Sequence, residues 1–483
     1  MFKQLIKDSA LYGFADFFFK ILAFFTFPIF AHLLSVNDFG VMSFAAVIAG
    51  FVGMFMSLGL NNAIQRFYFD VSIPPEQRPA LVSTGFIILT IWSGVLTLLF
   101  VLVAYIFKDY ILLKYQLPFS YMAVALLTNI PMLLLTYSND IIRLHFKPVN
   151  FLILAFCRNM AGILLAIILM KYYHMGLWGY FVANFVAALA FIPLGIFLTK
   201  QDLKLVFDKK IGGIIARFGY PFIFAGLAYW LFGSMDRWML AEWSNMEQAG
   251  LYSIAFKFGS IVLFINSAFG QAWSPIAIKI MHDEPDNYRL FFSKLFTYWF
   301  AILLIVGTAS SFFAYEFLRF TTPESYWNAA NISIWVVMGL VFSSTTQLTA
   351  IGISISKKTK YLTYIAWITA GINFLANLIL IPWWGALGSA VATFITYIIL
   401  SGGYLVISQR LHPLPLQKFK LGLLCCFLVI SLTLSLYLNS FQWAWHIILI
   451  KCGWLCALAF LFLKFKIIDL PALRQVFTKS KNG

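Results

Sequence analysis

The chain has 483 residues, of which 62% are hydrophobic and only 11% are charged, and its formal net charge at pH 7 is +16. Soluble domains contain about 45–50% apolar and roughly 25% charged residues, so this composition excludes a water-soluble enzyme or binding module. The mean hydropathy of +0.87 indicates a protein that exposes most of its surface to lipid. We therefore expect the lipid bilayer to surround it.

Hydrophobic runs between polar breaks predict an all-α, polytopic membrane protein with about fourteen transmembrane helices, because about 20 apolar residues cross the bilayer core. The first run, residues 11–34, lacks a small-residue cleavage site, and we interpret it as a helix and not as a signal peptide. The predicted spans are residues 11–34, 39–65, 80–106, 118–142, 148–170, 175–198, 212–236, 248–278, 291–316, 328–356, 361–382, 385–408, 419–438 and 443–463.

Lysine and arginine residues are unevenly distributed between the two ends of these spans. Of the 34 such residues, 25 lie in the N-terminus, the even-numbered loops and the C-terminal tail, five lie in the opposite loops, and four lie within spans. Cytoplasmic loops carry the excess of basic residues in membrane proteins, so both termini are predicted to be cytoplasmic. Topology thus accounts for the net charge, and no nucleic-acid partner is expected.

Two short matches indicate an internal repeat. Residues 38–45 (DFGVMSFA) resemble residues 248–255 (QAGLYSIA) at an offset of 210, with Gly40 matching Gly250. Residues 176–185 resemble residues 385–394 at an offset of 209. Because the two matches lie in different elements and share nearly one offset, we interpret them as traces of a duplication.

The repeat predicts how the chain is divided. Each half would hold six spans, an even number, so both halves enter the membrane from the same side and are related by an axis along the membrane normal. We predict a six-helix lobe at residues 1–205, a second at 206–410, and two extra helices with a basic tail at 411–483.

The motifs of the first two spans resemble a known family. The run LYGFADFFFKILAFFTFPIFAHLLSVNDFG (11–40), followed by LGLNNAIQRFYFD (58–70), is similar to the Wzx-type oligosaccharide flippases of the MOP superfamily. Second-half motifs, AGLYSIAFK (249–257) and GALGSAVAT (385–393), also resemble that family, so the pattern covers about residues 5–410. The matching residues of the first two motifs are Gly13, Lys20, Pro28, Asp38-Phe39-Gly40, Leu58-Gly59 and Arg66-Phe67.

The resemblance implies a transporter, not an enzyme, with two six-helix lobes. Its substrate would be an oligosaccharide on undecaprenyl diphosphate, flipped from the cytoplasmic to the periplasmic leaflet of the bacterial inner membrane for O-antigen, capsule or exopolysaccharide assembly. A polysaccharide polymerase and the chain-length machinery would be its partners. No cofactor or metal is expected, and the coupling ion would be H⁺ or Na⁺.

Three basic residues are predicted to lie deep within spans. Lys20, Arg158 and Lys257 come from both halves, and a charge at mid-bilayer costs about 2.5–3.5 kcal/mol unless it meets a partner or a cavity. A diphosphate needs cationic partners, and the arginine fork binds phosphate with two hydrogen bonds. We predict that these three residues line one substrate cavity. The alternative is local neutralisation, for example of Lys20 by Asp16 one turn earlier.

Two further arginines are candidate substrate contacts at the cytoplasmic ends of spans. Arg66 has Asp70 four residues later, and Arg143 has Asp140 three residues earlier. Residues three or four apart share a helix face, so local ion pairing is the favoured interpretation and substrate contact the alternative.

Other polar residues within spans also have two interpretations. Asp236 is a candidate ion-coupling carboxylate, as is Asp16, but pairing of Asp236 with the adjacent Arg237 explains it equally well. Asn373 and Asn377 are predicted to form hydrogen bonds between helices, with contact to sugar as the alternative.

Rival functions differ in the charges and loops that they require. A drug or cation antiporter of the same superfamily would use acidic residues, whereas the spans hold three deep cations and one deep carboxylate, Asp16. A lipid II flippase would share the diphosphate, so charge does not separate it from an oligosaccharide flippase. A membrane glycan polymerase or ligase needs a large outer loop with acid and base groups, and the predicted outer loops are short.

Overall fold

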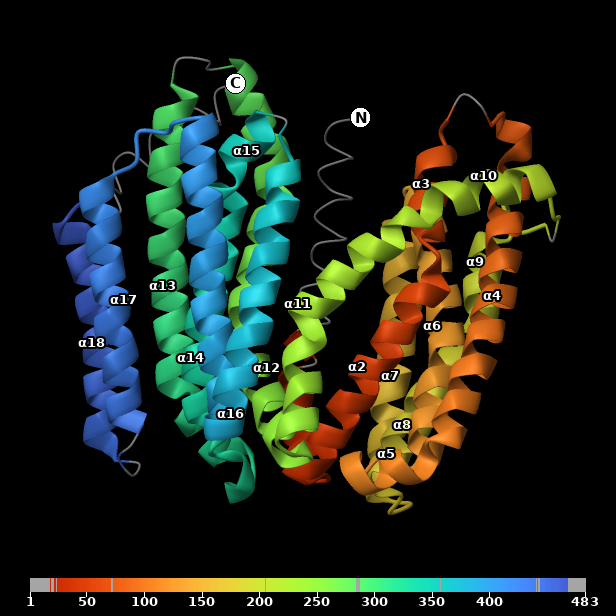
Figure 1. Ribbon diagram of the computed structural model, residues 1–483, viewed down its shortest axis with the longest axis horizontal. Coiled ribbons are helices and arrows are strands. Elements are labelled where there is room, and N and C mark those ends of the chain that lie inside the picture. The colour runs from red at the N-terminus through yellow and green to blue at the C-terminus, as the bar shows by residue number, and fades with distance from the viewer. Residues whose placement is uncertain are drawn as a thin grey trace. The chain divides into compact units, whose positions relative to one another are not determined.

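The computed structural model describes residues 18, 21–22, 24–70, 73–204, 206–283, 287–356, 358–439, 441 and 444–467. All regular secondary structure in these segments is helical (Figure 1). The predicted all-α fold is therefore confirmed. By contacts between residues the chain forms two compact units, Met1–Gly250 and Leu251–Gly483. The predicted division into lobes at residue 205 remains a prediction.

The first unit contains ten α-helices and one short 3-10 helix within its described residues, apart from the start of α12. These elements are α2 (Val36–Ser57), α3 (Leu60–Phe67), η1 (Pro75–Gln77), α4 (Arg78–Ile106), α5 (Lys108–Tyr115), α6 (Phe119–Leu144), α7 (Pro148–Lys171), α8 (Gly176–Ala190), α9 (Ile192–Thr199), α10 (Lys209–Gly219) and α11 (Pro221–Trp243).

The second unit contains most of α12 and the helices that follow it. These elements are α12 (Met246–Asp283), α13 (Tyr288–Thr321), η2 (Glu324–Tyr326), α14 (Ala329–Thr349), α15 (Ile351–Ile355), α16 (Lys360–Leu411), α17 (Lys418–Asn439) and α18 (Trp445–Lys464). Most residues of α14 are buried, and it packs against α13 and α16. The helices α17 and α18 pack on α13.

Eleven helical stretches among the described residues are long and apolar enough to cross a membrane. Several of them follow predicted spans closely, as in Pro148–Lys171 against 148–170 and Gly176–Thr199 against 175–198. Lys360–Leu411 contains two predicted spans, and none of the eleven described stretches corresponds to the predicted span 212–236. The predicted first span, 11–34, lies partly outside the described residues. The total of about fourteen spans remains a prediction.

The 52-residue element α16 (Lys360–Leu411) contains two of the predicted spans. Gly385 interrupts it with φ 55° and ψ −129°, a conformation that only glycine adopts readily. Hydrogen bonds then join the two halves side by side, from Tyr404 Oη to Leu362 O at 3.2 Å and from Asn373 Nδ2 to Thr396 Oγ1 at 3.3 Å. The chain therefore reverses at Gly385, where the sequence predicts the boundary between two spans.

Local sequence determines where α2 begins and ends. At its start, Ser35 Oγ accepts a hydrogen bond from Asp38 N at 3.1 Å, and Asp38 Oδ2 accepts one from Ser35 N at 2.9 Å, which is a capping box. At its end, Leu58 and Gly59 have φ of 49° and 62°. These two left-handed residues break the helix, and α3 continues in a new direction.

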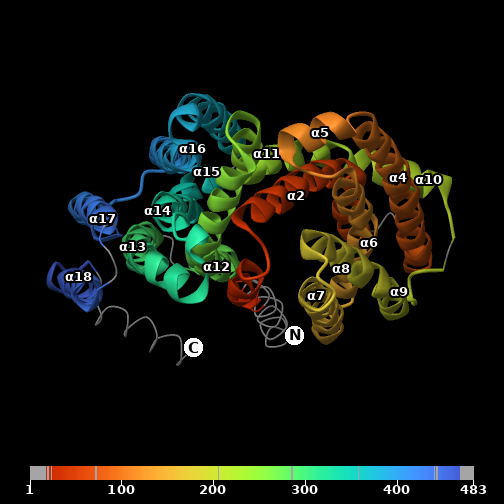
Figure 2. The same ribbon diagram turned by 90° about the horizontal axis from the view of Figure 1, so that it is seen from below.

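The break between α2 and α3 also contacts the end of α10. A Cβ at Gly59 would lie 2.2 Å from the carbonyl oxygen of Gly219, the last residue of α10. The two backbones therefore touch, and only glycine is small enough at either position. On the same helix Ile211 and Ile215 are buried, and α10 packs on α3 and α4 near one end of the first unit (Figures 1 and 2).

The helix α6 is central to the first unit and packs against α2, α4, α8 and α9. Tyr137 of α6 is 1% exposed and donates a hydrogen bond to Val82 O at 2.8 Å. A Cβ at Gly85 would lie 2.4 Å from the Tyr137 hydroxyl, so glycine at that position allows α4 and α6 to approach closely. This packing positions the polar residues of α6 described below.

Candidate substrate site

Among the predicted substrate contacts, Arg158 is the one deep cation whose side-chain hydrogen bonds are described. It lies on α7 and is half-buried. Its Nη1 donates to Asn159 Oδ1 at 2.6 Å, and its Nη2 lies 2.7 Å from Met132 Sδ. Both partners are neutral, and within the described segments Arg158 forms no ion pair. Because a guanidinium carries five N–H donors, this side chain keeps donors for an additional acceptor.

Neutral amide side chains lie close to Arg158. Asn159 and Asn184 each donate from Nδ2 to a backbone carbonyl four residues earlier, both at 2.9 Å. Asn184 of α8 faces Gly162, one turn after Arg158, since a Cβ there would lie 3.7 Å from Asn184 Oδ1. A guanidinium beside amide oxygens can bind phosphate oxygens and sugar hydroxyls together.

The other predicted cations lie elsewhere in the chain. Lys20 and the nearby Asp16 lie outside the described residues. Lys257 is half-buried on α12 in the second unit, where its carbonyl oxygen accepts a hydrogen bond from Ser260 Oγ at 2.5 Å. That Lys20, Arg158 and Lys257 share one cavity remains a prediction.

Arg66 and Arg143 lie against the acidic neighbours named from the sequence. Arg66 Nη1 is 2.9 Å from Asp70 Oδ2, and the Arg66 side chain is 60% exposed. Arg143 Nη1 is 3.7 Å from Asp140 Oδ1, and the Arg143 guanidinium also lies over the ring of Phe151, 4.4 Å from its centre. Both predicted local pairs are therefore present, and a role of either arginine in substrate contact remains a prediction.

Asp236 is buried on α11, with 8% exposure. The adjacent Arg237 donates from Nη1 to the carbonyl of Gly233 on the same helix at 3.1 Å. An ion-coupling role for Asp236 remains a prediction. In the second unit, Asn373 and Asn377 are buried and bonded to each other at 3.1 Å, and Asn373 also reaches the second half of α16. The predicted hydrogen bonding between spans is confirmed for Asn373.

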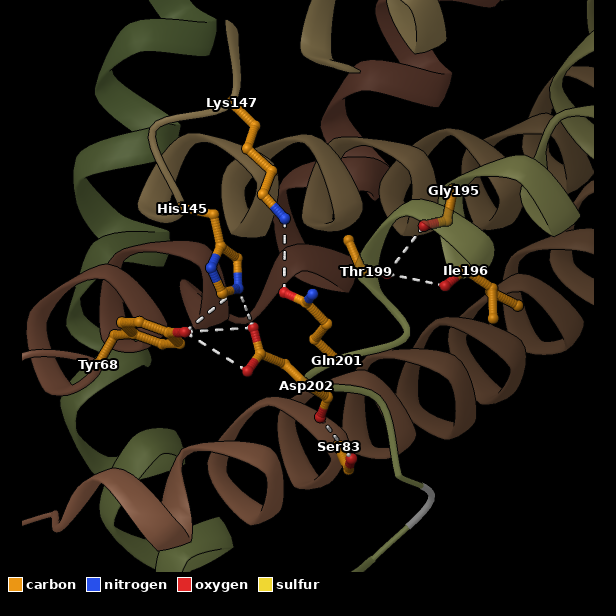
Figure 3. A network of polar contacts seen from close by, with 9 residues as sticks. All are labelled: Tyr68, Ser83, His145, Lys147, Gly195, Ile196, Thr199, Gln201 and Asp202. Carbon is orange, nitrogen blue, oxygen red and sulfur yellow. Dashed lines mark hydrogen bonds and ion pairs between the residues drawn. The ribbon is translucent and has the colours of Figure 1, made fainter. Parts of the chain in front are cut away.

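A polar network that the sequence does not reveal joins three loops of the first unit (Figure 3). His145, directly after α6, forms a short contact with Asp202, which follows α9. The Tyr68 hydroxyl lies 3.2 Å from Asp202 Oδ2 and 3.3 Å from His145 Nε2. Burial, followed by the effect of Asp202, raises the pKa of Tyr68 to about 12. The hydroxyl is therefore protonated and donates.

The same network holds the segment that connects α9 to α10. Ser83 Oγ donates to Asp202 O at 3.2 Å and accepts from Lys204 N at 2.9 Å. Asp208 is the N-cap of α10, and its Oδ1 accepts from the backbone N–H groups of residues 210 and 211. At the other end of this connection, Asp208 N donates to Thr84 Oγ1 of α4 at 2.9 Å, so both ends of the connection are bonded to α4.

Comparisons with known proteins identify the family. Residues 5–281 match the family described as polysaccharide biosynthesis proteins. The chain belongs to this family. Over 431 residues it is 23% identical to an uncharacterized membrane protein of Methanocaldococcus jannaschii, covering 85% of this chain and 99% of that protein.

Solved structures show the fold of this family member. The lipid II flippase MurJ, in an inward closed conformation, is similar with a TM-score of 0.74 and 16% identity, covering 95% of this chain and 100% of MurJ. An inward-facing MATE multidrug resistance transporter of the MOP superfamily has a TM-score of 0.60 and 15% identity, covering 83% and 94%. The Vibrio cholerae MATE transporter VcmN has a TM-score of 0.52 and 13% identity, covering 84% and 96%.

Family and fold together confirm the resemblance drawn from the sequence motifs. The chain is a multi-pass membrane protein of the polysaccharide biosynthesis family, and its fold is that of the MurJ and MATE structures. The identity of its substrate is a separate question, which depends on the residues within its spans.

Proposed function

We propose that this protein is a flippase that moves oligosaccharides linked to undecaprenyl diphosphate from the cytoplasmic to the periplasmic leaflet of the bacterial inner membrane. The flipped units would enter O-antigen, capsule or exopolysaccharide assembly. A polysaccharide polymerase and the chain-length machinery would act next. The observation that carries the proposal is the half-buried Arg158, whose hydrogen-bonding partners are neutral. Membership in a polysaccharide biosynthesis family supports the class of substrate.

The physical argument concerns the charge of Arg158. A cation within a span is tolerated where it meets an anion or water, and Arg158 forms no ion pair with any described carboxylate. The diphosphate of the substrate supplies that negative charge during passage. Lys20 and Lys257 would add two further positive charges from other spans, and Arg66 and Arg143 are additional candidate contacts at helix ends.

Transport can be tested directly with purified protein in proteoliposomes. The probe is undecaprenyl diphosphate carrying a fluorescent oligosaccharide, and its arrival in the opposite leaflet is measured by accessibility to a membrane-impermeant quencher. We expect Arg158→Ala to abolish flipping and Arg158→Lys to retain part of it, because the charge is kept while the two-pronged hydrogen bonding is lost. Lys171→Ala, on the exposed end of the same helix, is the matched control. Full flipping by Arg158→Ala would overturn the proposal.

Lys257 provides a second test in cells, with surface glycan display as the measurement. We expect Lys257→Ala to abolish display at normal protein level, and Lys257→Arg to keep much of it. If Lys257 instead only neutralises a neighbouring acid, removal of both partners together would restore display.

Lipid II is the second candidate substrate, because it carries the same diphosphate that Arg158 would bind. The same proteoliposome assay, run with fluorescent lipid II, separates the two. Flipping of lipid II without flipping of the oligosaccharide carrier would assign the protein to cell-wall synthesis. A drug or cation antiporter would flip neither.

A further inference from the structure

Asp140 is a buried carboxylate within helix α6 of the first unit, and the proposed transport step does not use it. It is 8% exposed and lies in the last turn but one of α6. The residues on either side of it along the packed face, Tyr137 and Ile141, belong to the buried apolar cluster that α6 forms with α3 and α4. An ionisable group in such a place within a span is costly, so it requires a functional or structural reason.

The charge of an ionised Asp140 is only weakly compensated. Asn61 of α3 donates from Nδ2 to Asp140 Oδ2 at 2.7 Å, and this donor is neutral. Arg143 is the single basic partner among the described residues, and at 3.7 Å from Oδ1 it is beyond hydrogen-bonding distance. The Arg143 side chain is 51% exposed, and its guanidinium lies over the ring of Phe151. Solvent therefore screens much of its effect.

The partner amide also has an unused acceptor. Asn61 Oδ1 is buried and accepts no hydrogen bond within the described part of the chain. A buried acceptor without a partner is unfavourable. Rotation of the amide by 180° exchanges its donor and its acceptor. The site can thus offer a donor to a carboxylate, or an acceptor to a protonated carboxyl group.

We propose that Asp140 and Asn61 form a proton-binding site in the first unit. In the ionised state, Asn61 Nδ2–H donates to the carboxylate, as the structure shows. On protonation, one H⁺ from water binds a carboxylate oxygen, the amide rotates, and the new O–H donates to Asn61 Oδ1. Each state therefore contains one hydrogen bond between Asn61 and Asp140. The net reaction is the uptake of a single proton.

The position of Asn61 connects this site to the break between α2 and α3. It is the second residue of α3, directly after the left-handed pair Leu58 and Gly59 that separates α3 from α2. Gly59 is in backbone contact with Gly219, where α10 ends before α11 begins. A change in the bond between α3 and α6 therefore acts on the break between α2 and α3 and on α10. That the proton drives transport rests on the proposed function, whereas the proton site itself does not.

Two pairs of charged or titratable groups lie close to this end of α6. His145 is bonded to Asp202, and Arg66 to Asp70. The helices α8 and α9, which also pack on α6, carry no charged residue. The remaining charged residues on elements packed against α6 are Asp38 on α2, Arg78 on α4, Lys108, Asp109 and Lys114 on α5, and Arg158 and Lys171 on α7.

The site is tested by infrared difference spectroscopy of the full-length protein in lipid, which detects the C=O stretch of a protonated carboxyl group as pH is lowered. We expect Asp140→Asn to remove one titrating carboxyl signal, and the exposed control Asp109→Asn to keep it. We expect Asn61→Leu to keep the signal but shift its frequency, because the O–H loses its acceptor. A signal that persists in full in Asp140→Asn would overturn the proposal, as would an unshifted signal in Asn61→Leu.

The role in transport needs a separate readout. In proteoliposomes an imposed pH gradient should accelerate flipping by the natural protein and leave flipping by Asp140→Asn unchanged. Arg158→Ala should lose flipping yet keep the carboxyl signal of Asp140. A titrating Asp140 without any flipping of the oligosaccharide carrier would therefore refute the proposed function and leave the proton site intact. Flipping by Asp140→Asn that still responds to the gradient would refute coupling through Asp140.

Discussion

A buried ion pair in the second unit permits a quantitative test of what holds α17 and α18 in place. Lys451 of α18 is 0% exposed. Its Nζ donates to Glu316 Oε1 at 2.6 Å, to Phe312 O at 2.7 Å and to Asn439 Oδ1 at 2.9 Å. All three ammonium protons are thus used, and α13, α17 and α18 meet at this one group. Glu316 is itself only 6% exposed.

The magnitude follows from this burial. Removal of one partner from a buried ion pair costs about 3–5 kcal/mol, whereas replacement of both partners by apolar residues is often neutral or stabilising. We expect Lys451→Met to lower the free energy of unfolding by about 3–5 kcal/mol, because Glu316 would remain as a buried carboxylate without its cation. Glu316→Leu should cost less, since Lys451 keeps two carbonyl acceptors. The double variant should recover most of the loss.

The measurement is equilibrium unfolding in detergent micelles, followed by far-UV circular dichroism for the three variants. Lys464→Met, an exposed lysine at the end of the same helix, is the matched control and should change little. If the double variant were as unstable as the sum of the two single variants, the pair would have no coupling energy. The appended helices would then be held by apolar packing alone.

Three further outcomes follow from the geometry. Gly59→Ala should destabilise the first unit in a thermal-unfolding assay, because its φ of 62° and the 2.2 Å approach both exclude a Cβ, whereas Gly94→Ala, with open space around it, should be tolerated. Tyr68→Phe should cost about 1.5–3 kcal/mol in the same assay, because Asp202 loses a hydrogen bond to its charged carboxylate. Reporter fusions should be cytoplasmic at Lys358 and periplasmic at Asn439, and a periplasmic signal at Lys358 would contradict the predicted topology.

The spans were predictable because their signal is local. Each needs only an apolar run long enough to cross the bilayer, and polar or glycine-rich breaks mark its ends. The reversal at Gly385 follows from the same signal, because Pro382 and Gly385 interrupt an otherwise continuous apolar stretch. The pairs Arg66–Asp70 and Arg143–Asp140 were also predictable from the sequence, because a helix brings residues three or four apart together.

The polar contacts between distant segments were not predictable from one sequence. Asn61 and Asp140 are 79 residues apart, and His145 and Asp202 are 57 residues apart. Their contacts depend on how α3 and the α9–α10 connection pack against α6, which no local pattern reports. From sequence, Asp140 has an obvious partner in Arg143. The structure shows that the closer partner is the neutral Asn61, and this difference turns an ordinary ion pair into a candidate proton site.

Gly40 and Gly250, which match in the sequence repeat, have equivalent surroundings in the structure. A Cβ at Gly40 would lie 1.7 Å from Met246 O, and a Cβ at Gly250 would lie 2.1 Å from Val36 O. Met246 precedes Gly250 by four residues, and Val36 precedes Gly40 by four, so the two contacts are the same contact made twice. All four residues lie in the first unit, and each glycine meets the carbonyl group four residues before the other glycine. The offset of 210 that relates the two motifs in sequence thus relates two helix ends that touch, and each glycine is required because the other helix occupies the place of its side chain.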